Sequence, residues 1–370
     1  MINFKKYGKR CLSLLLAASM ILMPSVQTFA EEETAAAPTD STQTENWPQG
    51  PATYADSAIV MDMNSGAVLY SKQIEKKHYP ASITKLLTTL VALDNAELTD
   101  TVEFSQDSIS FLEYGDAHIG MTPGEQISME DALYAVLLAS ANEVSYAVAE
   151  SVGKKMGGGY DTFIQAMNDE SEKLGCTGSH WTNANGLHDE QHYTTAHDMA
   201  RIGAAVYQKE AFRTISQSLS HTIPVTNLVN EERTFQQKHK MLWPQNDNYY
   251  EYCKGGKTGY TDQARTTLVT MADNGDMQLV AVVLYDFGND AYIDTRAMFD
   301  YAYSNFSKIS LKDQKLPEGV KSYEDEDAYI VLPKSAQFSD VKAEVKEDSN
   351  KDGSGTVTFT YKGQEVGSVK

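Results

Sequence analysis

Apolar residues recur along this chain of 370 residues in two patterns, one typical of strands and one typical of helices. Asn64-Ser65-Gly66 and Asp273-Asn274-Gly275 are turn sequences, and each lies between two apolar-rich runs. Each turn therefore predicts a β-hairpin. The runs are 58–63 and 67–71 around the first turn, and 265–272 and 277–285 around the second.

Helical spacing of apolar residues dominates the region between the two hairpins. The predicted helices are 82–93, 128–138, 142–152, 161–174 and 195–208, with a further helix at 291–305 after the second hairpin. Strands at both ends of a helical region favour one antiparallel sheet to which both hairpins contribute. We therefore predict an α/β (α+β) domain, with an antiparallel sheet and a block of helices.

Composition divides the chain into further parts. Residues 31–50 are rich in Glu, Thr, Ala and Pro and have few large apolar side chains, which predicts a disordered linker. The catalytic domain is predicted over 51–305, and a small β-rich domain over 306–370. Within that small domain we predict strands at 328–332 and 356–361 and a polar loop at 344–355.

The first 30 residues have the composition of a secretory signal peptide. Four basic residues precede an apolar run over 11–23, and the segment ends on Thr28-Phe29-Ala30. The run is shorter than the roughly 20 residues that a spanning helix needs, so cleavage after Ala30 is expected rather than anchoring. The sequence thus predicts a secreted protein, extracellular or associated with the cell wall, and no membrane anchor is evident in it.

Charge and cysteine content narrow the function classes. The chain carries 31 Lys and Arg against 51 Asp and Glu, a formal net charge of −20. Such an acidic surface argues against nucleic-acid partners and against docking on anionic lipid by charge alone. Cys176 and Cys253 are too few for a disulfide framework, and we expect them to be unpaired rather than bridged.

Ser82 and Lys85 are three residues apart, so a helix that begins at Ser82 places both on one face of its first turn. A serine hydroxyl becomes an effective nucleophile when a base takes its proton. Lys85 can be that base only if it is neutral, which requires burial or a nearby cation. The alternative is an ordinary helix start, with Ser82 as the cap and Lys85 in solvent.

Ser140-Ala141-Asn142 separates two predicted helices. Two polar side chains between buried helices are expected to be functional if they face a cleft. Ser140 would then pass a proton to a leaving amine, and the Asn142 amide would hold the substrate backbone. The alternative is a helix–helix turn with local caps.

Lys257-Thr258-Gly259 begins a strand-like segment. Lys257 offers a permanent cation and Thr258 a hydroxyl, which together suit a free carboxylate. Gly259 lets a ligand approach the strand, and the Tyr260 N–H could form an oxyanion hole with the Ser82 N–H. Taken alone this motif also fits a glycine-rich turn. The three motifs in this order nevertheless describe a serine acyl-transfer site.

The chain resembles the low-molecular-mass penicillin-binding proteins, specifically the serine-type D-Ala-D-Ala carboxypeptidases of bacterial cell walls (peptidase family S11). Ala141 favours this family over the β-lactamases, in which an Asp stands between Ser and Asn. The segments that carry the resemblance are 80–85, 138–142, 183–188, 193–200 and 256–261.

The resemblance implies a penicillin-binding/β-lactamase-like transpeptidase fold and a mechanism for removing the terminal D-alanine of peptidoglycan stem peptides. It implies that Ser82 attacks and Lys85 acts as base. Asn142, Lys257 and Thr258 would bind the substrate, with Gly259 and Tyr260 beside them, and Ser140 would relay a proton. β-Lactam antibiotics would be covalent inhibitors. The resemblance implies no metal and no organic cofactor.

Some of the chain's residues also fit other functions. His188, His192 and His197 would allow a zinc hydrolase, although the chain has no His-Glu-x-x-His. A Ser-His-Asp hydrolase is disfavoured because no Gly-x-Ser-x-Gly occurs. A β-lactamase and a catalytically idle peptidoglycan-binding scaffold are the remaining alternatives. The intact Ser82, Lys85 and Lys257 argue against the scaffold, which has no need of all three.

Overall fold

A computed structural model describes residues 47–348 and 354–370 of the chain. The predicted signal peptide, and the predicted linker up to residue 46, lie outside the described residues. None of the helices in the described part is long and apolar enough to cross a lipid bilayer.

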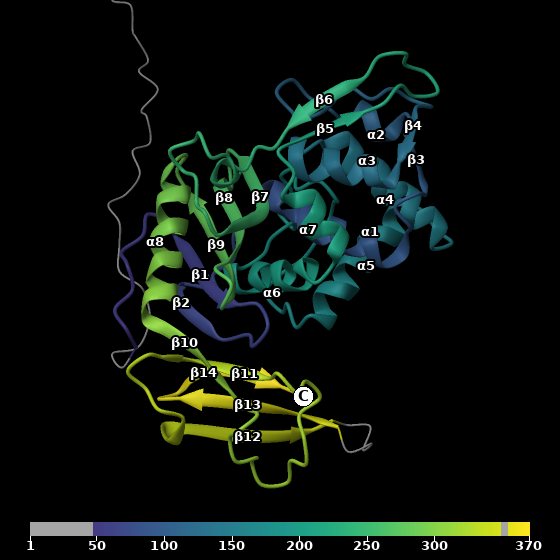
Figure 1. Ribbon diagram of the computed structural model, residues 1–370. Helices are drawn as coiled ribbons and strands as arrows, with labels where there is room; N and C mark the ends of the chain where they lie inside the picture. The colour runs from purple at the N-terminus through teal and green to yellow at the C-terminus, as the bar shows by residue number, and fades with distance from the viewer. Residues whose placement is uncertain (1–46, 349–353) are drawn as a thin grey trace, which may run out of the picture. The chain divides into compact units, whose positions relative to one another are not determined.

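A five-stranded antiparallel sheet has the strand order β2-β1-β9-β8-β7 (Figure 1). Both predicted hairpins are confirmed, the first as β1–β2 and the second as β8–β9. β7 is an edge strand, so one side of its backbone is left without a partner strand. The strands are β1 (Ser57–Asp62), β2 (Val68–Lys72), β7 (Cys253–Thr261), β8 (Arg265–Asp273) and β9 (Gln278–Asp286).

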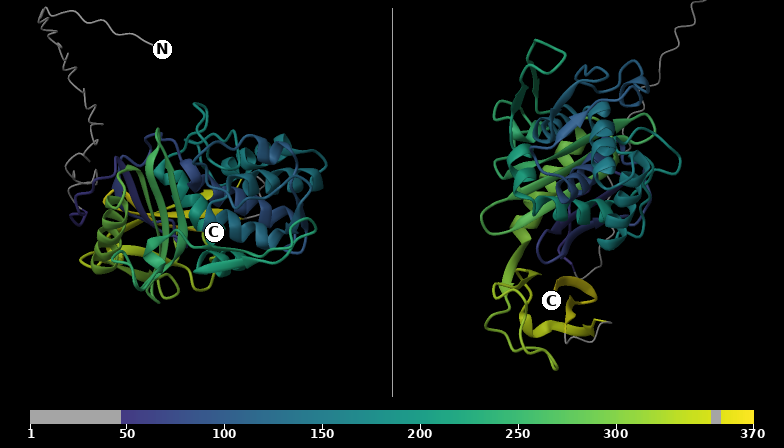
Figure 2. Two further views of the ribbon diagram at one scale, coloured as in Figure 1. Left: turned by 90° about the horizontal axis from the view of Figure 1, so that it is seen from above. Right: turned by 90° about the vertical axis from the view of Figure 1, so that its right-hand side faces the viewer.

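Helices cover both faces of this sheet, which explains why its inner strands are apolar almost throughout. In β1, Ile59 and Met61 pack with the block of helices, whereas Ala58 and Val60 pack with residues of α8 (Asp290–Asn305). Figure 2 shows the strands between α8 on one side and the remaining helices on the other. The sheet is thus the middle layer of three.

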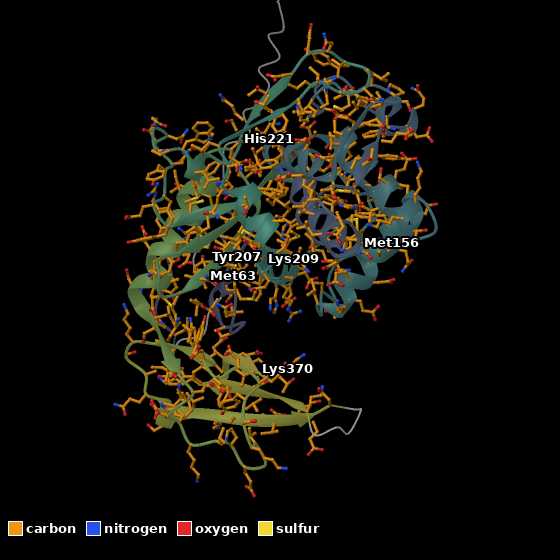
Figure 3. All side chains as sticks on the ribbon, turned by 45° about the vertical axis from the view of Figure 1, so that its right-hand side comes forward. Met63, Met156, Tyr207, Lys209, His221 and Lys370 are labelled. Atoms are coloured by element: carbon orange, nitrogen blue, oxygen red, sulfur yellow. The ribbon has the colours of Figure 1, made fainter. Side chains whose placement is uncertain are left out.

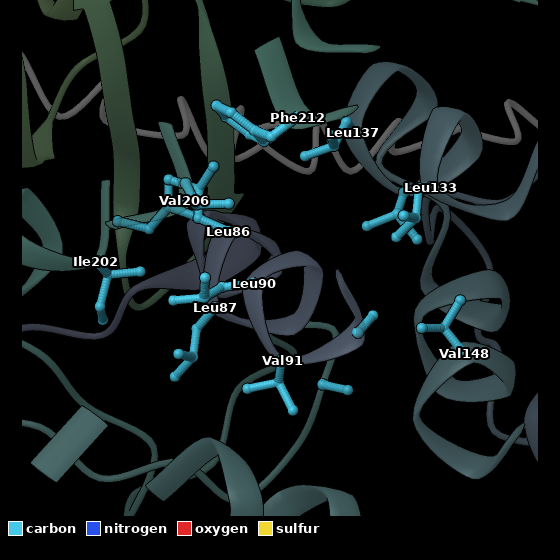
Figure 4. Close-up of a cluster of buried hydrophobic side chains, with 14 of the residues drawn as sticks. Leu86, Leu87, Leu90, Val91, Leu133, Leu137, Val148, Ile202, Val206 and Phe212 are labelled. Carbon is cyan, nitrogen blue, oxygen red and sulfur yellow. The ribbon is translucent and has the colours of Figure 1, made fainter. Parts of the chain in front are cut away.

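α1 lies in the interior of the helical block. Leu86, Leu87, Leu90 and Val91 are at most 2% exposed, and they pack among apolar side chains of the surrounding helices (Figure 4). This packing fixes the start of α1, where the first motif is found. The helices of the block are α1 (Lys85–Asn95), α2 (Asp107–Ser110), α3 (Met129–Tyr134), α4 (Asn142–Lys155), α5 (Tyr160–Lys173), α6 (Ala196–Tyr207) and α7 (Glu210–Ser216).

The predicted helices are confirmed, with differences at their ends. The helix predicted from Ser82 begins as a 3₁₀ turn (Ala81–Thr84) before α1. The helix predicted over 128–138 is α3 followed by a π-helical turn (Ala135–Ala139). Thr195 caps α6, because its hydroxyl accepts the Asp198 N–H at 3.1 Å.

Two short hairpins were not predicted. β3 (Thr101–Glu103) pairs with β4 (Gln126–Ser128), and β5 (Ser220–Ile223) pairs with β6 (Arg233–Gln236). Each strand has only three or four residues, too few for an alternating apolar pattern to be recognised.

The strands predicted in the last part of the chain are confirmed as β11 and β13, but the polar loop predicted over 344–355 is partly wrong. Residues 344–347 belong to β12 and pair with β13. β12 is an edge strand whose side chains are nearly all exposed, so its sequence is polar and its pairing comes from the backbone. The strands are β10 (Phe306–Ser310), β11 (Tyr329–Pro333), β12 (Val341–Glu347), β13 (Gly355–Tyr361) and β14 (Gln364–Val369).

The last residues of the predicted disordered linker, 47–50, are ordered in the structure. Trp47 is only 6% exposed, its indole N–H donates to the Leu69 carbonyl at 2.9 Å, and its ring lies 5.3 Å from that of Phe306. A single buried Trp is enough to hold residues 47–50 on the folded chain, so disorder there is a wrong prediction. The domain boundary after residue 305 stays a prediction. It coincides with the end of α8.

Candidate active site

Residues of all three motifs line one open cleft of about 850 Å³. The motif residues on its wall are Ser82, Ser140, Asn142, Thr258, Gly259 and Tyr260. Lys85 and Lys257 lie behind this wall, with side chains that are at most 1% exposed. The fold therefore brings together the eight residues that the sequence selected.

Lys85 is hydrogen-bonded on all sides. Its Nζ lies 3.0 Å from Ser82 Oγ, 2.8 Å from Asn142 Oδ1 and 2.6 Å from the Asn185 carbonyl. A neutral amine has two hydrogens and one lone pair. The hydrogens fit Asn142 and Asn185, which accept only, and this leaves the lone pair for the Ser82 hydroxyl.

The environment of Lys85 favours this neutral form. Burial lowers the pKa of Lys85 to about 7, and the positive charge of Lys238 contributes in the same direction. A base with such a pKa is unprotonated in a large fraction of molecules at neutral pH. Lys85 can act as base only if it is neutral, and its burial and the nearby Lys238 both favour the neutral form.

The backbone next to the serine is held in an unusual conformation. Ala81 has φ +51°, in the left-handed region that residues with a side chain seldom adopt. The segment approaches Gly186 so closely that a Cβ on Gly186 would lie 1.9 Å from the Ala81 carbonyl oxygen. Contacts from another loop therefore keep Ser82 at the cleft wall.

Ser140 and Asn142 reach the cleft because the chain turns sharply between α3 and α4. After the π-helical turn, Ser140 adopts φ +63° and ψ +31°, and α4 begins at Asn142. The Asn142 N–H also donates to the Ala117 carbonyl at 2.8 Å, which ties the loop between α2 and β4 to the start of α4.

Lys257 is buried, although the sequence predicts a cation that binds a carboxylate. It is 1% exposed, and its Nζ donates to Ser140 Oγ at 3.0 Å and to the Thr258 carbonyl at 2.8 Å. Burial, together with the charges of Lys85 and Lys238, lowers the pKa of Lys257 well below its usual value. Its surroundings thus act against the permanent charge, which stays a prediction, because the motif gives residue types but not their burial.

Gly259 allows the edge of β7 to touch the backbone of the serine. A Cβ at this position would lie 2.4 Å from Thr267 Oγ1, 2.9 Å from the Ser82 nitrogen and 3.1 Å from the Pro80 carbonyl oxygen. The Ser82 nitrogen therefore lies immediately beside β7, next to Tyr260 in sequence. The predicted oxyanion hole from these two N–H groups needs this proximity.

Replacing Gly259 by alanine is expected to push β7 away from Ser82 and to lower kcat/KM by about 100-fold, because the oxyanion donors separate. Steady-state kinetics check this, with Gly159→Ala as the matched control, since a Cβ on Gly159 meets no atom within 4 Å. Equal kinetics for both variants would show that the close contact has no catalytic importance.

A family model described as D-alanyl-D-alanine carboxypeptidase matches residues 42–288. The chain belongs to this family. It is 29% identical to D-alanyl-D-alanine carboxypeptidase DacF of Bacillus subtilis, over 98% of this chain and 90% of the relative. It is 31% identical to D-alanyl-D-alanine carboxypeptidase DacB2 of Mycobacterium tuberculosis, over 70% of this chain and 84% of the relative.

Solved structures give the same assignment. The crystal structure of a D-alanyl-D-alanine carboxypeptidase from Mycobacterium tuberculosis matches with a TM-score of 0.61 and 30% identity, over 72% of this chain and 96% of that one. The Streptomyces K15 DD-transpeptidase matches with a TM-score of 0.62, over 69% of this chain and 99% of that one. At 21% identity the latter shows a shared fold only. The predicted resemblance and fold class are confirmed, and with them a serine hydrolase of the penicillin-binding D-Ala-D-Ala carboxypeptidase type.

Some residues of this carboxypeptidase site were not predicted. The Asn185 carbonyl accepts from Lys85, and Lys238 lines the cleft. The loop between α2 and β4 contributes residues 111 and 113–117 to the cleft wall. A backbone acceptor and a lone lysine outside any motif leave no signal in one sequence.

The histidines considered for zinc make separate contacts. His192 bonds Thr84 Oγ1 at 2.8 Å, His197 pairs with Glu75, and the ring of His188 packs against Tyr79. In the part of the chain that the structure describes, no three His, Cys, Asp or Glu side chains are grouped to hold a metal. Cys176 and Cys253 are both buried free thiols.

Proposed function

We propose that Ser82 is the nucleophile with which this carboxypeptidase removes the terminal D-alanine from peptidoglycan stem peptides that end in D-Ala-D-Ala. The observation that carries the proposal is the Lys85 Nζ to Ser82 Oγ distance of 3.0 Å, made by a buried lysine whose other two hydrogen-bond partners are acceptors.

Acylation begins when neutral Lys85 takes the Ser82 proton. The Ser82 oxygen then forms a bond to the carbonyl carbon of the penultimate D-alanine, and the developing negative charge is stabilised by the Ser82 and Tyr260 N–H groups. The C–N bond breaks as the leaving amine takes a proton. Ser140 stands on the cleft wall, 3.0 Å from Lys257 Nζ, where it can relay to that amine the proton that Lys85 took from Ser82, so that Lys85 is neutral again once the acyl-enzyme has formed.

Deacylation uses the same groups. Water gives a proton to neutral Lys85 while its oxygen bonds to the ester carbon. The bond between that carbon and the Ser82 oxygen then breaks, Lys85 returns the proton to Ser82, and the shortened peptide leaves. Asn142 positions the peptide backbone, and Thr258 offers its hydroxyl on the cleft wall. A β-lactam presents a strained amide to the same serine and would remain attached as an ester.

We also propose that the enzyme acts outside the cytoplasm, secreted and associated with the cell wall. The composition of the first 30 residues supports this, as does the extracellular position of the polymer on which the family acts. The acidic net charge of −20 suits a protein that binds neither nucleic acid nor anionic lipid by charge.

Release of D-alanine from a diacylated L-Lys-D-Ala-D-Ala tripeptide tests the substrate assignment. We expect one D-alanine for each peptide cleaved and none from the L-Ala-L-Ala isomer. Turnover of benzylpenicillin without cleavage of either peptide would instead identify a β-lactamase. If the protein cleaved neither the peptides nor benzylpenicillin, and benzylpenicillin did not attach to it covalently, the result would identify a scaffold.

A further inference from the structure

A buried histidine behind the cleft connects two segments that are distant in the sequence. His192 is 1% exposed and is not one of the residues that line the cleft. Its Nε2 lies 2.8 Å from Thr84 Oγ1, and its Nδ1 lies 3.0 Å from the Thr182 nitrogen. Thr84 belongs to the 3₁₀ turn that contains Ser82, and Thr182 precedes Asn185 in the next segment. Both segments therefore meet at one imidazole ring.

The hydrogen-bond partners of His192 determine which ring nitrogen carries the hydrogen. The Thr182 N–H can only donate, so Nδ1 is an acceptor without a hydrogen. Burial lowers the pKa of His192 to about 3, which keeps the ring neutral and puts its one hydrogen on Nε2. Nε2–H then donates to the Thr84 hydroxyl, which in turn donates to the Ala81 carbonyl at 2.8 Å. A directed chain of hydrogen bonds thus runs from the Thr182 backbone to the residue before Ser82.

One end of this chain is the strained backbone next to the serine. Ala81 has φ +51°, a conformation that persists only where surrounding contacts hold it. The buried Thr84 hydroxyl provides such a contact through its bond to the Ala81 carbonyl. A Cβ on Gly186 would lie 1.9 Å from that carbonyl oxygen and 2.9 Å from Thr84 Oγ1. The turn is therefore packed too closely against the second segment to shift without moving it.

The other end of the chain is the segment that accepts a hydrogen bond from Lys85. The Asn185 carbonyl lies 2.6 Å from Lys85 Nζ. The side chain of Asn183 makes this segment compact, because its Oδ1 accepts the Gly186 N–H at 2.7 Å. Lys85 forms hydrogen bonds with both segments, the one with the nucleophile and the one with Asn185. His192 bonds the same two segments from behind.

We propose that His192 is a positioning residue for acylation, whose imidazole holds together the two segments around Lys85 and so sets the distance from Lys85 to Ser82. This inference rests on the proposed function, because it concerns the same serine and the same base. The ring lies behind the cleft wall, so its loss affects the rate of acylation rather than the binding of substrate. Burial is also the main reason why Lys85 is a weak enough base to be neutral, and the same two segments provide it.

Three substitutions of His192 remove its two hydrogen bonds separately and together. His192→Gln retains a donor toward Thr84, His192→Asn retains an acceptor toward Thr182, and His192→Phe retains neither. The rate of acylation by a chromogenic cephalosporin is measured by stopped flow from pH 5 to pH 9, at several concentrations of the cephalosporin. Each variant then has a maximal rate, a half-saturating concentration and a pH of half-maximal rate.

The expected change in His192→Phe has two parts. The maximal rate falls by about 10- to 100-fold while the half-saturating concentration stays within about twofold, as expected when reacting groups are displaced without a change in the substrate site. The pH of half-maximal rate rises above the wild-type value of about 7, because water that reaches Lys85 raises its pKa. The charges of Lys238, Glu143 and Asp116, which also act on Lys85, are the same in all variants. His192→Gln should recover more of the rate than His192→Asn, since it keeps the bond toward the serine.

Thr84→Val breaks the chain of hydrogen bonds one step closer to the serine and nearly keeps the shape of the side chain. It should raise the pH of half-maximal rate in the same direction as His192→Phe. This variant, with His192→Gln and His192→Asn, decides the question if His192→Phe does not fold. Circular dichroism of each variant shows whether it is folded.

His221→Gln is the matched control. His221, labelled in Figure 3, is on β5, is not among the residues that line the cleft, and bonds Asp131 at 2.7 Å. Its replacement should lower the melting temperature but leave the pH of half-maximal rate unchanged.

The positioning role is overturned if folded His192 and Thr84 variants keep the wild-type maximal rate and pH profile. It is also overturned if His221→Gln shifts the pH profile as much as they do, because a general loss of stability would then explain the effect. A wild-type enzyme that the cephalosporin does not acylate would instead contradict the proposed function itself, which is a different result.

Discussion

Replacing Ser82 by alanine is expected to lower D-alanine release at least about 10⁴-fold, since the variant lacks the hydroxyl that Lys85 would activate. The rate is measured with the diacylated tripeptide and an assay for free D-alanine. Activity that survives in the variant at more than a few per cent would show that another residue forms the acyl-enzyme.

The Ser82 variant is expected to fold normally. The only side-chain hydrogen bond of Ser82 Oγ among the described residues is with Lys85, so its loss changes the free energy of unfolding by about 1 kcal/mol or less. Thermal melts followed by circular dichroism check this. They separate a chemical loss from an unfolded sample.

Replacing Lys85 by methionine is expected to slow acylation by about 10²- to 10⁴-fold, the range that a general base provides. The side chains have similar volume, so the packing around α1 is kept. The variant leaves Asn142 Oδ1 and the Asn185 carbonyl without the Lys85 donor, and this opposes the benefit of removing a buried amine. Stopped-flow acylation with a chromogenic cephalosporin measures the rate.

The pH dependence of stability gives a second test of Lys85. Its pKa is about 7 in the folded chain and about 10.5 in the unfolded chain, so the unfolded chain binds more protons between these values. The wild-type protein therefore gains stability from this group as pH rises from about 7 to 10.5. We expect Lys85→Met to compare most favourably with wild type below pH 7, in melts at pH 6 and pH 9.

The same pKa sets the pH profile of the reaction. Because the neutral amine is the reactive form, wild-type acylation should fall about tenfold per pH unit below a pH of about 7 and level off above it. The Lys85→Met variant should lack this dependence. A wild-type rate that stays constant from pH 5 to pH 8 would contradict the role of Lys85 as base.

Local sequence patterns were sufficient to predict the parts of the site that depend on residues close together in the sequence. Ser82 and Lys85 face the same way because three residues make about one turn, and the apolar residues after them predict the burial of α1. The turn at Asn274 and the cap at Thr195 likewise have short-range causes.

What the sequence did not predict depends on contacts between distant segments. Lys257 is bonded to Ser140, which is distant from it in sequence, and Lys238 lines the cleft with residues from several other segments. Trp47 and β12 follow the same rule, since a partner elsewhere in the chain decides whether they are ordered.

The most direct test of the acyl-enzyme account is the intact mass of the protein after incubation with benzylpenicillin. The account predicts a gain of one benzylpenicillin mass in the wild type, located after proteolysis on the peptide that contains Ser82, and no gain in Ser82→Ala. An adduct on another residue, or no adduct and no penicillin turnover in the wild type, would contradict it.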